Sequence, residues 1–161
     1  MKILSRLTSV FVLFVFSIAE ENWAGPDFLV IGAMKSGTSS LLEYLVDHPQ
    51  IKKGKEKEIH FFDKYFSKGV EWYETQFPKK EENSDFLTGE ATPAYLLFPS
   101  IPKKVYELYP DVKLIVILRN PVDRAFSNHK MNLRNGKNVA SFEDRIFKEL
   151  KTIEKHCKNR N

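Results

Sequence analysis

The chain has 161 residues, of which 42% are apolar and 13% aromatic, so it is long enough and apolar enough for one domain with a buried core. Its net charge of +4 falls to +2 without Lys2 and Arg6, since 23 basic residues then stand against 21 acidic ones, and so mild an excess gives no electrostatic case for nucleic-acid binding. No His/Cys cluster at zinc spacing and no acidic cation-binding loop occurs in the sequence, and we therefore expect no metal site.

The N-terminus has the pattern of a secretory signal peptide. Lys2 and Arg6 precede an apolar stretch at 10–18, which ends in the small-x-small sequence Ser17-Ile-Ala19. This run of about a dozen residues is shorter than the ~20 that a spanning helix needs. We therefore expect residues 1–19 to be a signal peptide, and the domain at 26–161 to lie in the lumen of the secretory pathway or to be secreted. Cys157 is the single cysteine, which in that oxidising compartment suggests a bridge to a partner outside this sequence.

A strand, a loop and a helix start are predicted between Asp27 and Ser40. The apolar run from Phe28 to Ile31 gives way to Gly-Ala-Met-Lys-Ser-Gly-Thr and then to a helical pattern. The N-terminus of a helix leaves backbone N–H groups unpaired and carries partial positive charge, so an anionic phosphate or sulfate is stabilised there. The segment is therefore a candidate anion site.

The residue types in this loop favour the same interpretation. Gly32 and Gly37 allow a tight turn, Lys35 supplies a mobile cation, and neighbouring hydroxyls add donors. The candidate ligands are Lys35, Ser36, Gly37, Thr38, Ser39 and Ser40. The spacing differs from the nucleoside-triphosphatase loop G-x-x-x-x-G-K-[ST], because Thr38 stands where that loop has its lysine. The alternative is a glycine-bearing strand-to-helix turn with a solvated lysine.

The middle of the chain alternates helical and strand patterns. A helix after the loop ends near His48-Pro49, because proline disfavours its continuation. The lysines at 52–57 predict a basic loop, which either is simply solvated or favours an acidic acceptor. Further on, the patterns predict a helix at 70–77, a short strand at 86–88, and a helix at 102–109 with proline in its first turn.

A second strand with a polar end follows at 111–118. This near-continuous run of apolar, β-branched residues is typical of a parallel strand buried on both faces. Ligands of open α/β sheets bind beyond the carboxyl ends of the strands, which is where Arg119 stands. Ser127 lies about two helical turns further on. Arg119 and Ser127 are thus candidates for holding a second phosphate group.

These patterns predict an α/β fold, a three-layer P-loop-like unit with a central parallel sheet flanked by helices. A last helix is expected to begin at Ser141, because Ser-Phe-Glu-Asp resembles a capping box. Its apolar residues include Phe147 and Leu150, and we expect the face that they form to be exposed.

Three motifs stand in order along residues 26–131: the 32–40 loop, then Lys57-Glu-Ile-His-Phe-Phe-Asp63, then Leu118-Arg-Asn-Pro-Val-Asp-Arg-Ala-Phe-Ser127. Together they resemble the sulfotransferase family, and within it the heparan-sulfate-type carbohydrate sulfotransferase domain. A whole domain of that family is considerably longer, so the chain looks like its N-terminal part, either a fragment or a degenerate copy.

The resemblance implies transfer of a sulfuryl group from 3′-phosphoadenosine 5′-phosphosulfate (PAPS) to a hydroxyl or amine, with a glycosaminoglycan-like carbohydrate as the expected acceptor. By resemblance, residues 35–40 match the family's 5′-phosphosulfate site, and Arg119 and Ser127 match its 3′-phosphate site. Glu58 falls at the place of a general base in heparan 3-O-type relatives. His60 and Asp63 match residues near the acceptor.

The chemistry of these side chains agrees with such roles but leaves the base open. Lys35 is suited to the charge that develops on the leaving phosphate. Glu58 has to accept the acceptor's proton, which requires a carboxylate within hydrogen-bond reach. His60 is the alternative base, because an unperturbed imidazole titrates near neutrality. A histidine packed beside Phe61 and Phe62 is also compatible with the pattern.

One departure from the family concerns the acceptor. Heparan-type relatives commonly have Glu-Lys-Thr-Pro where this chain has Glu90-Ala-Thr-Pro93, so Ala91 removes a cation that would contact an acidic polysaccharide. Glu90, Thr92 and Tyr95 either line the pocket or belong to a turn fixed by Pro93.

Three alternatives stay open. Enzymes that resemble this chain are often type II Golgi proteins, so the N-terminal segment is either cleaved or retained as a short anchor, and only an anchor would bring the protein to a membrane. A P-loop nucleotide kinase would need a Mg²⁺-holding acid at the end of the second strand, where this chain has Arg119 and Asn120. The short length favours a non-catalytic remnant that binds PAPS or glycan.

Overall fold

The computed structural model describes residues 25–158, apart from residue 82 and residues 138–139. The predicted signal peptide at 1–19 lies outside these residues. The side chains from 153 onward, including that of Cys157, are not described either. None of the helices in the described part combines the length and the apolar character needed to cross a membrane.

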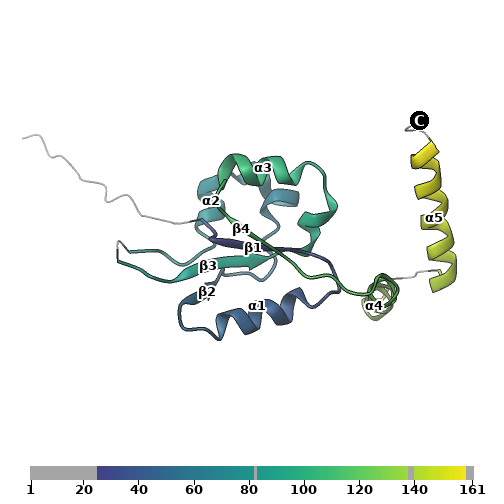
Figure 1. The fold of residues 1–161 in the computed structure, drawn as a ribbon, viewed down its shortest axis with the longest axis horizontal. Coiled ribbons are helices and arrows are strands. Elements are labelled where there is room, and N and C mark those ends of the chain that lie inside the picture. Colours follow the sequence, from purple (N-terminus) through teal and green to yellow (C-terminus); the bar gives the residue numbers. More distant parts are fainter. Residues whose placement is uncertain (1–24, 82, 138–139, 159–161) are drawn as a thin grey trace, which may run out of the picture.

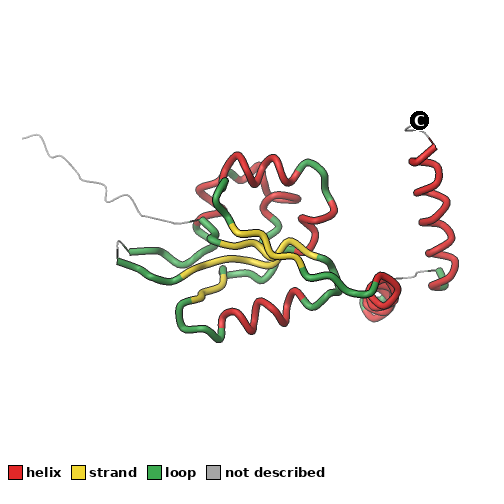
Figure 2. Tube along the Cα trace, viewed as in Figure 1, coloured by secondary structure: helices red, strands yellow, loops and turns green. Residues whose placement is uncertain are grey.

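Within the described residues, four parallel strands form one sheet in the order β2-β3-β1-β4 (Figure 2). The strands are β1 Phe28–Gly32, β2 Ile51–Lys53, β3 Leu87–Ala91 and β4 Lys113–Val116. Leu29 of β1 is in register with Glu90 of β3 on one side and with Leu114 of β4 on the other. The carboxyl ends of these three strands therefore lie at the same edge of the sheet.

Helices cover both faces of this sheet (Figure 1). Helix α1 lies against one face, α2 and α3 lie against the other, and α4 and α5 follow beyond the end of β4. The helices are α1 Thr38–Val46, α2 Val70–Glu74, α3 Ile101–Leu108, α4 Pro121–Arg134 and α5 Phe142–Lys158. Three shorter turns complete the set: a π-helical η1 Phe61–Tyr65, and 3-10 turns η2 Phe66–Lys68 and η3 Pro93–Leu97. This arrangement confirms the predicted α/β class.

The core has two parts because the side chains of β1 alternate across the sheet. Phe28 and Val30 pack on the α1 side with Leu42. Leu29 packs on the opposite side with an aromatic group that includes Phe61, Phe62, Tyr73, Phe77 and Tyr95. The rings of Phe61 and Tyr73 are stacked, with centroids 4.3 Å apart. Burying each such side chain contributes roughly 1.5–3 kcal/mol, so the η1 turn is anchored mainly by its rings.

The strand predicted at 111–118 exists, but the expectation that both its faces are buried is wrong. β4 is an edge strand that pairs only with β1 among the described strands, and Leu114 and Val116 are 54% and 44% exposed. A continuous apolar run is typical of an interior strand. The apolar run correctly predicted a parallel strand. How much of that strand is buried depends on the elements that pack beside it in the fold.

Two elements were not expected from the sequence. Residues 51–53 form β2, although 52–57 was expected to be a loop, since a three-residue strand is too short to give an alternating pattern. The π-helical turn η1 follows His60, whose φ of 57° is left-handed.

The last helix begins as predicted: Ser141 Oγ accepts a hydrogen bond of 3.1 Å from the backbone N–H of Asp144. Phe147 and Leu150 are exposed on it, as expected.

Candidate active site

The loop between β1 and α1 has the geometry of an anion-binding turn. Lys35 and Gly37 have φ of 69° and 98°, a left-handed conformation that glycine adopts without strain. Gly37 is the residue before the first turn of the nine-residue helix α1. The N-terminus of α1 thus begins directly at the loop, and its unpaired N–H groups favour negative charge there.

Backbone hydrogen bonds join this loop to the end of β4. The N–H of Ala33 donates to the carbonyl of Ile117, and the N–H of Ile117 donates to the carbonyl of Gly32, both at 2.8 Å. Nη1 of Arg119 donates to the backbone carbonyl of Lys35 at 3.3 Å. The two segments predicted to bind phosphate groups are therefore neighbours at the carboxyl edge of the sheet.

A cleft of about 400 Å³ lies at this edge. Four separate parts of the chain line it: the loop with the start of α1, the 57–58 segment, Pro93, and the end of β4 with α4. Its lining residues are Met34, Lys35, Gly37, Thr38, Ser39, Ser40, Lys57, Glu58, Pro93, Arg119, Ser127 and Met131. The structure thus brings together Lys35, Gly37, Thr38, Ser39, Ser40, Glu58, Arg119 and Ser127, which were candidates from the sequence.

Some candidates do not line the cleft, and some lining residues were not predicted from the sequence. His60 and Asp63 do not line it, and neither does Ser36, whose hydroxyl is buried without a hydrogen-bond partner in the described structure. Met34 and Met131 were not anticipated. Met131 had a usable signal, since it stands four positions after Ser127 and therefore on the same face of α4.

Glu58, His60 and Asp63 form a connected row. Oε2 of Glu58 lies 3.4 Å from Nε2 of His60, and Nδ1 of His60 lies 2.9 Å from Oδ2 of Asp63. The Asp63 side chain is almost fully buried, whereas Glu58 is about one-third exposed, facing the cleft. Nζ of Lys57 lies 3.5 Å from Oε1 of Glu58. The row can orient a carboxylate at the cleft wall, with a cation beside it.

Glu90, Thr92 and Tyr95 are buried and do not line the cleft. Of the two interpretations left open by the sequence, the structure favours the turn. Glu90 is fully buried and accepts hydrogen bonds from Tyr73, Thr92, Tyr95 and the backbone of Ile59. Burial raises the pKa of the Glu90 carboxyl above its usual range, although these hydrogen bonds act in the opposite direction.

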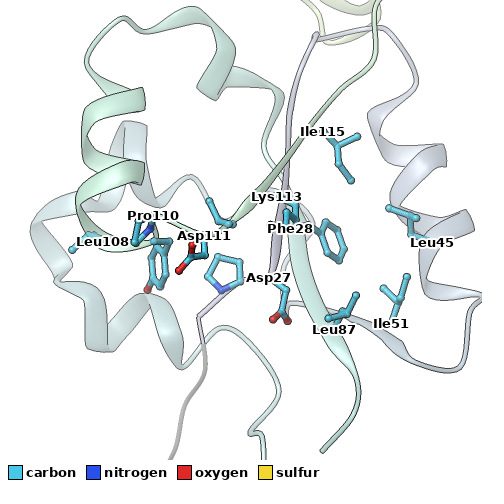
Figure 3. Close-up of a pocket in the computed structure, with 13 residues that line it drawn as sticks. Asp27, Phe28, Leu45, Ile51, Leu87, Leu108, Pro110, Asp111, Lys113 and Ile115 are labelled. Atoms are coloured by element: carbon cyan, nitrogen blue, oxygen red, sulfur yellow. The ribbon is translucent and has the colours of Figure 1, made fainter.

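A larger cavity, of about 690 Å³, lies at the other end of the sheet (Figure 3). Phe28, Leu45, Ile51, Leu87 and Ile115 give it a largely apolar wall. The carboxylate of Asp27, which also lies there, is already bound by Lys80 Nζ and by the backbone N–H of Thr88, both at 2.7 Å. Parallel α/β sheets bind ligands at the opposite edge. We therefore place the candidate site in the smaller, polar cleft.

The described residues offer little to a metal ion. No group of three or more His, Cys, Asp or Glu side chains that could hold one occurs among them. Within the described wall of the cleft, Glu58 is the single carboxylate, and Lys35, Lys57 and Arg119 are the cations. The cleft is suited to an anionic ligand.

A parallel α/β sheet with a glycine-bearing loop, a helix N-terminus and cationic side chains at its carboxyl edge defines a P-loop-like protein with a candidate site for phosphate or sulfate groups. A family model described as the sulfotransferase domain matches residues 25–160. The chain belongs to the sulfotransferase family.

Similar proteins agree with this assignment. The chain is 39% identical over 136 residues to the membrane-associated sulfotransferase kil1 of Dictyostelium discoideum, covering 80% of this chain and 29% of that protein. It is 36% identical over 123 residues to heparan sulfate glucosamine 3-O-sulfotransferase 6 of Homo sapiens, covering 76% of this chain and 35% of that protein. The chain thus spans about a third of the length of these relatives.

A solved structure shows the same fold. The sulfotransferase of Alicyclobacillus acidocaldarius superimposes with a TM-score of 0.69 at 34% identity, covering 83% of this chain and 60% of that one. The fold is therefore a sulfotransferase fold over most of the chain.

Proposed function

We propose that this protein binds PAPS and transfers its sulfuryl group to a hydroxyl or amine of a carbohydrate acceptor. One observation carries the proposal. A single cleft contains the hydroxyl-rich loop at the start of α1, the pair Arg119 and Ser127, and the carboxylate of Glu58. Two anion sites and a candidate base suit an in-line transfer from a donor that has anionic groups at two separate positions.

The residues at the loop fit the phosphosulfate end of PAPS. Thr38, Ser39 and Ser40 line the cleft, and their hydroxyls can donate hydrogen bonds to phosphate or sulfate oxygens. Lys35 lines the same cleft, and the N–H groups at the start of α1 add partial positive charge. Arg119 and Ser127, which line the same cleft, would hold the 3′-phosphate.

The chain's own residues would then align the partners and stabilise charge. When bound, PAPS supplies the sulfuryl group, whose S–O bond to the 5′-phosphate breaks as the acceptor oxygen or nitrogen bonds to sulfur. Glu58 takes the acceptor's proton, and Lys35 stabilises the negative charge left on the phosphate. His60 orients Glu58 and is itself held by Asp63, as the distances of 3.4 and 2.9 Å indicate.

The acceptor class rests on the relatives. The name of a human relative, heparan sulfate glucosamine 3-O-sulfotransferase 6, specifies a glycosaminoglycan acceptor. We propose a related carbohydrate for this protein, and a place in the lumen of the secretory pathway where such chains are built. The kinase alternative is less well supported, because Arg119 lines the cleft where a nucleotide kinase holds Mg²⁺ with an acid.

Radiolabelled PAPS tests the proposal directly. The full chain would be incubated, without added Mg²⁺, with heparan sulfate, desulfated heparan sulfate, chondroitin and a simple phenol, and calorimetry would measure binding of adenosine 3′,5′-bisphosphate. Transfer to a carbohydrate is the expected result. Nucleotide binding without transfer would identify a non-catalytic remnant, and preference for Mg²⁺-ATP would identify a kinase. If the chain neither bound the nucleotide nor transferred a sulfuryl group, the proposal would be overturned.

A further inference from the structure

We propose that Glu90 is a positioning residue for the transfer, because its buried carboxylate holds the backbone of residues 59–61, the segment that carries Glu58 and His60. Glu90 does not line the cleft and would not touch either substrate. The inference rests on the proposed function, in which Glu58 and His60 serve the acceptor side.

Three consecutive backbone N–H groups lead to this one carboxylate. The N–H of Ile59 donates directly to Oε2 of Glu90 at 3.1 Å. The N–H of His60 donates to Oγ1 of Thr92 at 3.4 Å, and Thr92 in turn donates to Oε2 at 2.5 Å. The N–H of Phe61 donates to the hydroxyl of Tyr95 at 2.9 Å, which donates to Oε1 at 2.8 Å.

The backbone conformation explains why these groups converge. His60 has a left-handed φ of 57°, and successive N–H groups around such a residue form a concave site for an anion. Burying a carboxylate is costly unless its oxygens are hydrogen-bonded. A side chain at position 90 that cannot accept these bonds would therefore leave buried N–H and hydroxyl groups unsatisfied. The 59–61 backbone would then lose the contacts that set its position.

The connection reaches the candidate base through short covalent and noncovalent links. Glu58 immediately precedes Ile59, and His60 lies between two of the anchored N–H groups. The carbonyl of Lys57 also accepts a hydrogen bond of 3.3 Å from the N–H of Ala91, the residue after Glu90. A shift of the 59–61 backbone would change the Glu58–His60 distance of 3.4 Å. The donor loop is not part of this network, so donor binding has no reason to change with it.

Two tyrosines provide a matched pair for the test. Tyr73 and Tyr95 are both buried, and each donates a hydrogen bond of 2.8 Å to Oε1 of Glu90. Only the Tyr95 hydroxyl also accepts from the backbone of the segment, at Phe61. Tyr73→Phe and Tyr95→Phe therefore remove the same group from the same carboxylate oxygen, and they differ in the link to residues 59–61.

Amide hydrogen exchange of the full ¹⁵N-labelled chain measures how well the backbone N–H groups of residues 59–61 are protected, and it does not depend on turnover. We expect Tyr95→Phe to speed exchange at Phe61 about five- to tenfold relative to Val30, a core reference in β1, since one hydrogen bond is lost. Glu90→Gln is expected to speed exchange at Ile59 as well. Tyr73→Phe is expected to leave the ratio between the segment and Val30 unchanged. Equal ratios in all three variants would overturn the proposal.

A double-mutant cycle tests the link to catalysis. Glu90→Gln should lower kcat at least tenfold while the affinity for adenosine 3′,5′-bisphosphate stays within twofold. In a Glu58→Gln background it should lower kcat by much less, because residues that act as one unit are not additive. The same factor in both backgrounds would contradict positioning. If the wild-type chain transferred no sulfuryl group, the proposed function would fail, and the exchange ratios would still decide whether Glu90 holds the segment.

Discussion

The side chain of Arg119 is bonded to the backbone of Lys35: its Nη1 donates to the Lys35 carbonyl over 3.3 Å. The residue proposed for one end of the donor therefore contacts the loop proposed for the other end. Arg119 is otherwise exposed and lines the cleft, so its guanidinium can also contact a phosphate group there. A ligand that bridges the two sites would meet groups already joined to each other.

Arg119→Ala should weaken the affinity for adenosine 3′,5′-bisphosphate by about tenfold or more, because charged hydrogen bonds to the 3′-phosphate are lost. Titration calorimetry at fixed ionic strength measures this effect. Arg134→Ala is the control, since Arg134 is exposed at the end of α4 and does not line the cleft. Equal affinities for the Arg119 variant and the control would rule out the 3′-phosphate role.

Lys35→Ala should lower kcat by about 10²-fold, because Lys35 is proposed to meet charge that develops only as the phosphate leaves. Donor affinity should fall by a smaller factor. Initial rates with labelled PAPS, together with calorimetry, separate the two effects. Lys103→Ala, on the exposed side of α3, controls for the loss of a cation. A purely solvated lysine would show no more effect than that control.

Glu58→Gln should lower kcat by 10²-fold or more while donor affinity changes less than twofold, since the amide keeps the shape of the side chain but cannot take a proton. The same two measurements apply. Glu56→Gln offers a close comparison, because Glu56 is exposed two positions earlier and does not line the cleft. Parallel losses of donor affinity and turnover in the Glu58 variant would show that Glu58 is not the base.

Local signals in the sequence account for the parts that were predicted correctly. Two glycines, a lysine and a run of hydroxyl residues mark the 32–40 loop, and Arg119 directly follows an apolar run. The Glu90 network had no such signal, because its partners come from Ile59, Tyr73 and Tyr95, as many as 31 positions away. The exposure of β4 likewise depends on its neighbours in the sheet and not on its own residues.

The stability of the chain should depend on pH through Glu90. Burial raises its pKa above the ordinary value of 4.5, so the folded state holds the proton more tightly than the unfolded state does. The stability from this group is therefore fully present below about pH 4.5 and is lost as the pH rises through the raised pKa. Urea unfolding of the wild-type chain and of Glu90→Gln across this range measures the difference. We expect the free energy of unfolding of the wild-type chain to fall relative to that of Glu90→Gln as the pH rises. An identical pH dependence of the two proteins would contradict this.

Gly89→Ala should destabilise the fold by about 1–3 kcal/mol, the usual cost of overpacking. Gly89 of β3 is in register with Phe28 of β1, and an added Cβ would overlap the Phe28 carbonyl oxygen and lie 2.6 Å from its ring. Neither the backbone nor the buried ring can move away without disturbing the sheet. Because Gly89 precedes Glu90, a shifted β3 should also speed amide exchange at Ile59. Gly136→Asn is the control in urea unfolding, since Gly136 has open space around it and asparagine tolerates its φ of 69°. If both variants unfolded at the same urea concentration, the close packing of β3 against β1 would be refuted.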